Sequence, residues 1–250
     1  LINKTLSGLY SPGSTIKPIV ALSALENNVV DTKFKVKCTG KMELYEQTFH
    51  CWKEEGHGWV SLKNAMKQSC DTYFYEVARL LGVDRLNKTA EKFGLGKKVL
   101  GDYFDNEKKG LFPNTVWKKN NLGKGWVLGE TLITGIGQGY TQTTPLQLCM
   151  MTAQIANGGY AIKPKIIVDS NPVSYEDAKQ SMESGLLFDT DSEELIDKKL
   201  FKDKKNIKIV QEAMFASTNE RFGTSYKSRI DDPKYQFAGK TGTAQVKRIS

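Results

Sequence analysis

The sequence predicts an α/β fold of the layered α+β kind, and two observations lead to it. Patterns typical of helices gather in the first and middle parts of the chain, and patterns typical of strands come late. The chain has 250 residues with ordinary apolar and charged fractions, which allows one large domain or two small ones. We find no internal repeat and no low-complexity segment.

The first predicted helix follows a Pro-Gly turn at residues 12–13. Residues 19–25 are largely apolar, which predicts a buried helix that stops at residues 27–28. Because Pro18 has no N–H to donate, the first turn must be irregular, and regular helix is expected to begin near Lys17.

The next part of the chain changes from extended to helical patterns. Residues 34–60 are turn-rich and aromatic with little helical period, so we expect extended segments and loops there. Ser61 is a suitable N-cap for a short helix. Further helices are predicted over residues 73–81, closed by Gly82, and over residues 83–93.

Residues 100–130 are rich in glycine and lysine and are expected to be mostly loop. Thr144 and Pro145 then suit the start of a strong helix that runs to residue 156 and stops at an Asn-Gly-Gly sequence. Cys149 lies in the apolar run of this helix and is predicted to be a small core residue.

The last third of the chain predicts two strands and one helix. Residues 160–168 form the first probable strand, and residues 235–246 alternate small and apolar residues like an inner strand that borders a site. Residues 171–205 are polar and charge-rich, typical of a variable surface region, and residues 210–217 are predicted to be helical.

The formal charge of +8 comes from scattered lysines rather than from blocks. It suits an anionic surface such as a membrane face or a cell-wall polymer, and it fits a solvated lysine-rich surface equally well. No nucleic-acid motif accompanies it. The chain has no signal peptide and no apolar run long enough to span a bilayer, and it begins with Leu1, so we expect a piece of a longer, anchored protein.

The opening motif places a hydroxyl and an amine three residues apart. If Ser14 opens a helix, Lys17 lies one turn further along the same face, within hydrogen-bond reach of the hydroxyl. A serine attacks a carbonyl only when a base takes its proton, and an amine can do so when burial or nearby positive charge lowers its pKa. The free N–H groups of a helix start also point to where an oxyanion would form. Alone, the same pattern fits a simple helix cap.

Three such motifs follow one another in the order of the penicillin-recognising serine acyltransferases: Ser14-x-x-Lys17, Ser69-x-Asp71 and Lys240-Thr241-Gly242. Longer strings around them, PGSTIKP, SCDTYFY, GIGQGY and AGKTGTAQV, resemble the transpeptidase domain of class B penicillin-binding proteins. The similarity is strongest to the elongation-specific penicillin-binding protein 2 type of Gram-negative bacteria and covers essentially the whole chain. It implies the penicillin-binding transpeptidase or serine β-lactamase-like fold, an antiparallel sheet flanked by helices.

The resemblance implies a peptidoglycan D,D-transpeptidase that β-lactams inhibit. Ser14 would attack the penultimate D-Ala carbonyl of a stem pentapeptide, expel the terminal D-Ala and pass the acyl group to an amine of a neighbouring strand. Lys17 would be the general base, and Ser69 would relay a proton to the leaving amine. Lys240 would keep Lys17 neutral by like-charge repulsion.

The resemblance also implies a binding role for the last motif. Lys240, Thr241 and Thr243, around Gly242, would hold the substrate carboxylate. The backbone N–H groups of Ser14 and Thr243 would form the oxyanion hole, which is typically worth about 2.7–4 kcal/mol per donor.

Two departures from the family pattern affect these expectations. Asp71 stands where many relatives have Asn, and an ionised acid cannot donate as an amide does, so a structural role in the Ser69 loop is expected. The family's sheet normally continues beyond the last motif. We therefore expect residues 1–250 to be a transpeptidase domain that is incomplete at its C-terminal end, with the N-terminal anchor and pedestal domain missing.

Three cysteines and a histidine gather in one segment of the sequence. Cys38, Cys51, His57 and Cys70 are separated by 12, 5 and 12 residues and could supply a tetrahedral zinc shell. Relatives of the elongation type resemble this chain in having a metal site here. A Cys38–Cys51 disulfide is the main alternative in a periplasmic protein, and loose core cysteines are the other. His50 is a further possible ligand, although as a strand neighbour of Cys51 it would point away.

The family also implies location and partners. The expected location is the periplasmic face of the inner membrane. The expected partners are peptidoglycan stem peptides, β-lactams, a glycosyltransferase of the elongation machinery and a membrane-associated scaffold protein. A serine β-lactamase and a non-catalytic β-lactam sensor domain share the three motifs, although no Glu-x-x-Leu-Asn string of a lactamase lies between the second and third.

Overall fold

The computed structural model describes residues 2–101, 104–164 and 198–244. Its helices and strands, in chain order, are α1 Lys4–Ser7, the 3₁₀ turn η1 Gly13–Ile16, α2 Lys17–Glu26, β1 Lys35–Cys38, β2 Lys41–Leu44, β3 Gln47–His50, β4 Gly58–Ser61, α3 Leu62–Lys67, α4 Asp71–Leu81, α5 Val83–Lys92, α6 Thr115–Leu122, α7 Leu128–Thr134, α8 Pro145–Ala156, α10 Lys204–Asn219, η3 Tyr226–Ser228 and η4 Pro233–Tyr235.

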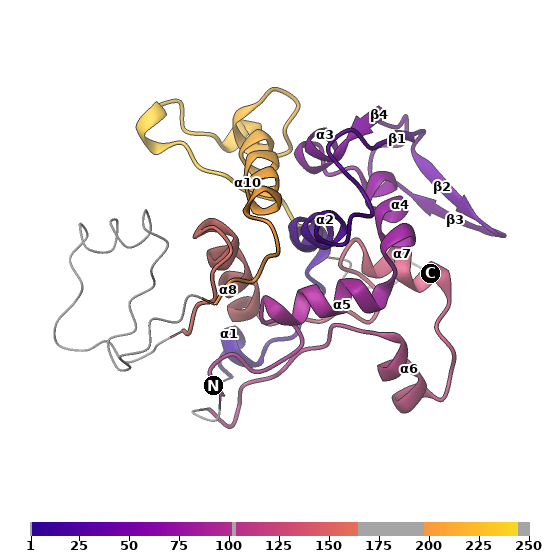
Figure 1. The fold of residues 1–250 in the computed structure, drawn as a ribbon, viewed down its shortest axis with the longest axis vertical. Helices are drawn as coiled ribbons and strands as arrows, with labels where there is room; N and C mark the ends of the chain where they lie inside the picture. The colour runs from indigo at the N-terminus through magenta and orange to yellow at the C-terminus, as the bar shows by residue number, and fades with distance from the viewer. Residues whose placement is uncertain (1, 102–103, 165–197, 245–250) are drawn as a thin grey trace.

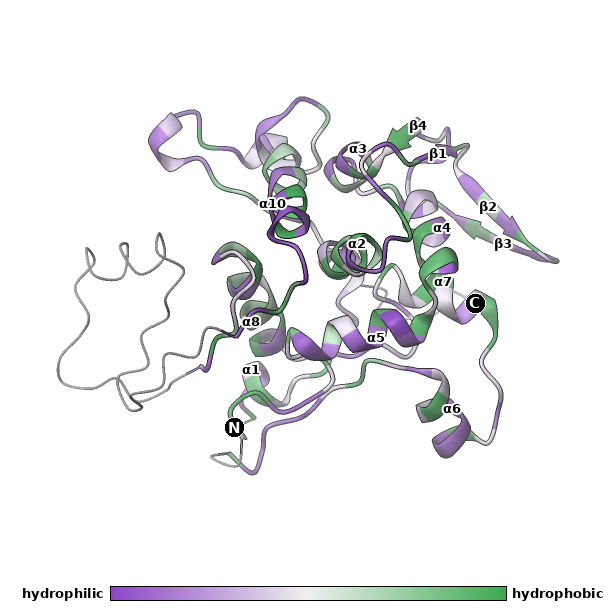
Figure 2. Cartoon of the chain, viewed as in Figure 1, coloured by the Kyte–Doolittle hydropathy of each residue, from purple (hydrophilic) through white to green (hydrophobic). Residues whose placement is uncertain are grey.

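Helix α2 is the centre of the molecule, and all ten of its residues are buried. In Figure 1 it is surrounded by α10, α3, α4 and α5, and it packs against all four. Figure 2 shows hydrophobic residues concentrated on α2 and α8. Regular helix begins at Lys17, after the 3₁₀ turn η1, as the missing N–H of Pro18 predicts.

Two small antiparallel sheets lie beside α4. Strand β1 pairs with β4, with Cys38 opposite Gly58, and β2 pairs with β3, with Lys41 opposite His50. The extended segments expected over residues 34–60 are therefore confirmed. Phe49 of β3 packs with Tyr75 of α4, with ring centroids 5.7 Å apart, which attaches the second sheet to the helical core.

The predicted helices of the middle region are confirmed, with small shifts at their ends. Helix α4 begins two residues earlier than expected, at Asp71, and α8 begins at Pro145 with the Thr144 side chain accepting from Gln147 N. Helix α10 extends beyond the expected residues 210–217 at both ends. Its first turn is held by Glu26 of α2, whose carboxylate accepts from Asn206 Nδ2 at 2.6 Å.

Residues 100–130 are mostly loop, as expected, although the short helix α6 and the start of α7 also lie there. The Asn114 side chain caps α6 by accepting from Trp117 N at 2.7 Å, and Gly123 ends it with a left-handed φ of 64°. Lys118 of α6 then pairs with Glu130 of α7. The prediction relied on the high glycine and lysine content of this region and did not consider the residues that cap α6.

The two predicted strands are not observed within the described residues. Tyr160 forms only a single bridge with Lys199, and the remainder of that prediction, residues 165–168, lies outside the described part. Residues 236–244 have no strand, and residues 245–246 lie outside. A strand needs a neighbour for its N–H and C=O groups, and side chains hold this segment instead: Asn219 Nδ2 donates to Phe237 O at 2.8 Å.

Three further expectations concern the surface region, Cys149 and membrane-spanning helices. Most of the predicted surface region, residues 171–197, lies outside the described residues. Cys149 is exposed, not buried, because it lies on the face of α8 opposite to buried Gln147 and Met151. Across the described residues, no helix combines the length and apolar character needed to cross a bilayer.

Candidate active site and metal centre

Ser14 and Lys17 lie on either side of the junction between η1 and α2. Half-buried Ser14 lines a cleft of about 620 Å³ that is also lined by Ser69, Asp71, Thr241 and Thr243. The five expected positions 14, 69, 71, 241 and 243 therefore share one cleft. Gly242 lies between the last two, where a side chain would meet Thr15 Cγ2 at 2.6 Å.

Lys17 is fully buried and contacts two residues that line this cleft, Ser69 and Asp71. Its Nζ donates to Ser69 O at 2.9 Å, to Ser69 Oγ at 3.2 Å and to Asp71 Oδ1 at 2.8 Å. These three acceptors use all three donors of an ammonium group. Within the described structure no hydrogen bond joins Lys17 to Ser14, so the expected direct contact is not formed in this resting arrangement.

Ser69 lies between two lysines. Its Oγ is 3.2 Å from Lys17 Nζ and 2.8 Å from Lys240 Nζ. Ser69 has a φ of 54°, a left-handed conformation that is unfavourable for a residue with a side chain. The turn between α3 and α4 thus holds a strained serine whose hydroxyl connects the first and third motifs.

Asp71, the first residue of α4, accepts from both sides of the cleft. Oδ1 forms the ion pair with Lys17, and Oδ2 accepts from the backbone N–H of Trp52 at 3.0 Å. Asp71 therefore fixes the Ser69 turn against two neighbouring segments, and it also balances the charge of a buried lysine.

Lys240 has a different environment from Lys17. Burial and the positive charge of Lys17 together lower the pKa of Lys240 to about 7, while Asp71 opposes the shift. Its Nζ also contacts Thr241 Oγ1 at 3.3 Å, and Thr241 Oγ1 lies 3.0 Å from Thr224 Oγ1. A row of hydroxyls thus extends from the lysine along one wall of the cleft.

Glycines allow three distant segments to meet beside Ser14. Gly13 has a φ of 57°, and a Cβ there would lie 2.2 Å from Thr243 O. Gly13 N donates to Gly137 O at 2.9 Å, and Gln138 Nε2 donates to Thr243 O at 3.0 Å. The glycine-dense residues 135–139 therefore serve close packing at the site.

Trp52, Gln138 and Thr224 also line the cleft, although none of them belongs to the three motifs. The dense glycines around Gln138 are a local signal of a close backbone approach. Trp52 and Thr224 lie in segments that only the folded chain brings to the cleft.

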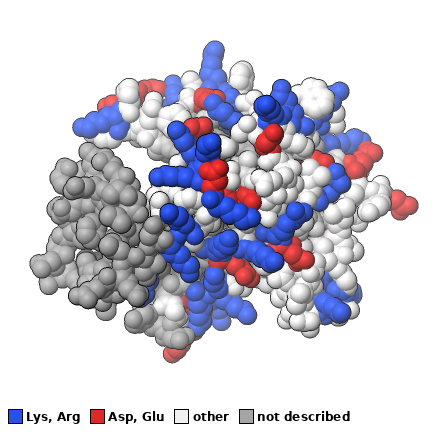
Figure 3. Space-filling model, viewed as in Figure 1, with Lys and Arg blue, Asp and Glu red and all other residues white. Residues whose placement is uncertain are grey.

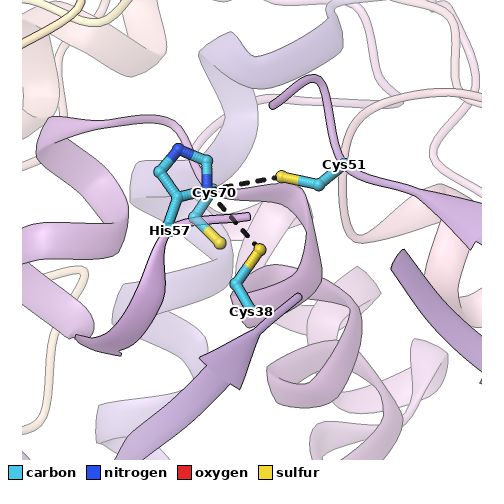
Figure 4. Close-up of side chains that lie close together, drawn as sticks. All are labelled: Cys38, Cys51, His57 and Cys70. Carbon is cyan, nitrogen blue, oxygen red and sulfur yellow. Dashed lines mark hydrogen bonds between the residues drawn. The ribbon is translucent and has the colours of Figure 1, made fainter. Parts of the chain in front are cut away.

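The predicted metal ligands Cys38, Cys51, His57 and Cys70 do come together, as Figure 4 shows. Their four ligand atoms lie within 4.8 Å of one another, and the Cys38 and Cys51 sulfurs are 3.5 Å and 3.6 Å from His57 Nδ1. All four cysteines of the chain, these three and Cys149, are free thiols. His50 is exposed and outside the cluster, as expected.

Hydrogen bonds within the cluster, together with burial, shift the pKa values of its side chains. A hydrogen bond with Cys70 lowers the pKa of Cys51, and the same contact, with burial, raises the pKa of Cys70. Burial would lower the pKa of His57, but hydrogen bonds with Cys51 and Cys38 raise it overall. Three crowded sulfurs around one imidazole nitrogen fit a divalent soft-ligand ion such as zinc, at metal–ligand distances of about 2.0–2.3 Å.

A family model described as the penicillin binding protein transpeptidase domain matches residues 1–249. The chain belongs to this family. The peptidoglycan D,D-transpeptidase MrdA of Acinetobacter baumannii is 35% identical over 100% of this chain and 35% of that protein. MrdA of Escherichia coli K12 is 32% identical over 98% of this chain and 37% of that protein.

Solved structures of the transpeptidase family agree with this assignment. Pseudomonas aeruginosa PBP2 in complex with WCK 5153 has a TM-score of 0.81 and 40% identity, over 98% of this chain and 52% of that chain. The complex of PBP2 and MreC from Helicobacter pylori has a TM-score of 0.81 and 31% identity, over 98% of this chain and 42% of that chain. The family and the fold class with mixed helices and antiparallel strands are thus confirmed, and the chain spans 35% to 38% of its first curated relatives.

Proposed function

We propose that this chain is the transpeptidase domain of a peptidoglycan D,D-transpeptidase of the MrdA type, and that it cross-links stem peptides through an acyl-enzyme on Ser14. The observation that supports it most is the shared cleft of Ser14, Ser69 and Thr243, with Lys17 and Lys240 both hydrogen-bonded to Ser69. Family membership over residues 1–249 supports the same reaction class.

The two lysines divide the proton chemistry between them. Lys240, with a pKa of about 7, is partly neutral at neutral pH and accepts a proton from Lys17 through the Ser69 hydroxyl. Neutral Lys17 then turns to Ser14, one helical turn away, and takes its proton as Oγ attacks the carbonyl carbon. Hydrogen bonds of this kind often tighten only when substrate is bound.

The proton returns by the same route when the C–N bond breaks. Ser69 Oγ delivers it to the leaving D-Ala amine, and the acyl group stays on Ser14 until an amine of a neighbouring strand attacks. Asp71 keeps Lys17 and the Ser69 turn in place. The backbone N–H groups of Ser14 and Thr243 stabilise the oxyanion.

Lys240, Thr241 and Thr243 bind the terminal carboxylate of the stem peptide. In support, the Lys240 ammonium and the Thr241 hydroxyl are 3.3 Å apart on one wall of the cleft. Gly242 lets this wall approach Thr15 closely. A β-lactam carboxylate uses the same groups.

The cluster of Cys38, Cys51, His57 and Cys70 holds a structural zinc ion. Zinc would supply charge neutralisation for the thiolates and cross-links between β1, the β3–β4 connection and the start of α4. Cys70 directly follows Ser69, so a bound ion would fix the backbone beside the cleft without contacting the reacting atoms.

The whole protein works at the periplasmic face of the inner membrane, with an N-terminal anchor and a pedestal domain outside residues 1–250 and further C-terminal strands completing the sheet. The name of the Helicobacter pylori complex supports a scaffold partner of the MreC kind, and a structure described as a peptidoglycan synthase complex supports a polymerising glycosyltransferase partner. The lysine-rich face in Figure 3 suits an anionic cell-wall polymer.

Mass spectrometry after incubation with benzylpenicillin tests the function. The wild-type chain gains the mass of one penicilloyl group, and Ser14→Ala gains none; labelling that persists in Ser14→Ala would contradict the assignment. Slow loss of the label excludes a β-lactamase. Release of D-Ala from a stem pentapeptide excludes a sensor domain.

A further inference from the structure

Trp52 belongs to none of the three motifs, yet it contacts the Ser69 turn at several atoms. It follows Cys51 of the cysteine–histidine cluster and lines the cleft. Its indole Nε1 donates to Gln68 O at 3.0 Å and to Ser69 O at 3.1 Å. Its backbone N–H donates to Asp71 Oδ2 at 3.0 Å.

Ser69 needs such support because of its backbone conformation. A φ of 54° is disfavoured for any residue with a Cβ, and such residues persist only where their neighbours hold them in place. The Ser69 carbonyl has two side-chain donors, Lys17 Nζ at 2.9 Å and Trp52 Nε1 at 3.1 Å. Trp52 is the one of these two that does not take part in proton transfer.

The Trp52 ring faces both the cysteine–histidine cluster and solvent. It meets the His57 ring edge-on, with centroids 5.4 Å apart, and 58% of the residue is exposed. A tryptophan at the surface could turn its indole N–H to water. Here the N–H points inward to the backbone of the catalytic turn.

We propose that Trp52 is a positioning residue, whose indole N–H holds the Ser69 carbonyl and so keeps the Ser69 hydroxyl between Lys17 and Lys240. This inference rests on the proposed acyl-transfer function. It assigns the N–H and the ring to different tasks: the N–H orients the turn, and the ring forms a wall of the cleft next to His57.

The test compares Trp52→Phe, which keeps an aromatic wall but loses the donor, with Trp59→Phe as a matched control. Trp59 of β4 is 67% exposed and is not among the residues that line the cleft. A labelled penicillin is used at increasing concentrations, which separates the maximal acylation rate from the half-saturation concentration. We expect Trp52→Phe to lower the maximal rate roughly 2- to 10-fold at unchanged half-saturation, the effect of one lost hydrogen bond, and Trp59→Phe to change neither.

A second variant separates the donor from the shape of the ring. Incorporation of 3-benzothienylalanine at position 52 keeps the bicyclic outline and replaces the N–H by sulfur. We expect the same reduced maximal rate, with zinc content equal to that of the wild type. A benzothienyl variant that acylates at the wild-type rate overturns this inference alone, whereas a wild-type chain that penicillin does not label overturns the proposed function as well.

Discussion

Two lysines share one serine in the cleft, but their surroundings differ at the level of single residues. Lys17 has a carboxylate partner, Asp71, at 2.8 Å. Lys240 has no ion pair within the described residues, and burial lowers its pKa to about 7. From the sequence we expected Lys240 to hold Lys17 neutral. The lowered pKa of Lys240 adds the prediction that this lysine itself changes charge near neutral pH.

The acylation rate should therefore rise with pH through the pKa of Lys240. Neutral Lys240 is the proton acceptor, so its fraction is small at pH 6, about half at pH 7 and nearly complete above pH 8. Stopped-flow acylation by a fluorescent penicillin between pH 5.5 and 8.5 measures this profile. Lys240→Arg stays charged, so we expect a low rate without this rise, whereas Lys234→Arg, an exposed change nearby, keeps the wild-type profile. A flat wild-type profile would exclude Lys240 as the titrating group.

The charge of Asp71 should matter for stability, because its partner is fully buried. Asp71→Asn leaves the Lys17 ammonium without a counter-charge, and breaking a buried ion pair typically costs about 3–5 kcal/mol. We expect a loss of this order in the free energy of unfolding at pH 6, measured by urea denaturation.

The matched control for Asp71→Asn is Glu43→Gln, which removes the carboxylate of an exposed pair with Lys41. Exposed pairs contribute little, so no measurable change is expected there. If Asp71→Asn is as stable as the wild type at pH 6, Lys17 does not carry a buried charge in the folded protein.

At the scale of elements, the site is made by segments that approach one another through glycines. The 3₁₀ turn η1, residues 135–139 and the third motif meet at Gly13, where the nearest atom to an added Cβ would be Thr243 O. This contact helps to bring the segments of the expected oxyanion donors, Ser14 and Thr243, to the same cleft.

Gly13→Ala should therefore affect activity as well as stability, and Gly58→Ala is its matched control. Both glycines have positive φ, 57° and 68°, so both substitutions introduce backbone strain of roughly 1–2 kcal/mol. Only at Gly13 does the added methyl collide with backbone, since nothing lies within 4 Å of the position at Gly58. We expect acylation to fall at least tenfold in Gly13→Ala and to stay unchanged in Gly58→Ala. Equal rates in the two variants would show that Thr243 need not lie against η1.

The sequence predicts an element correctly when the signals that determine it lie within the element's own residues. Helix α8 carries its own cap and stop signals, and α2 its own apolar run, so local reading finds both. Residues 236–244 look like a strand because small and apolar residues alternate, but a strand depends on a partner elsewhere in the chain. The five predicted cleft positions were found because their motifs are local, whereas Trp52 and Thr224 reach the cleft only through tertiary packing.

At the scale of the whole molecule, the cysteine–histidine cluster lies where both small sheets meet the start of α4. Cys38 ends β1, Cys51 follows β3, His57 precedes β4, and Cys70 precedes α4. An ion bound by all four would tie both small sheets to the helix that begins at the catalytic turn. Stability and activity should therefore depend on the same metal.

Removal of the metal is the test of this coupling. We expect about one zinc per chain by elemental analysis, and chelation under reducing conditions should lower both the melting temperature and the acylation rate, because Cys70 no longer fixes the residue next to Ser69. Cys51→Ser should reproduce this effect, and Cys149→Ser, a change at an exposed thiol outside the cluster, should not. Added zinc should restore the chelated wild type but not Cys51→Ser, since one of four ligands is gone. A metal-free wild type with Cys38 and Cys51 joined in a disulfide would replace zinc by a covalent cross-link, and acylation would then be lost on reduction rather than on chelation.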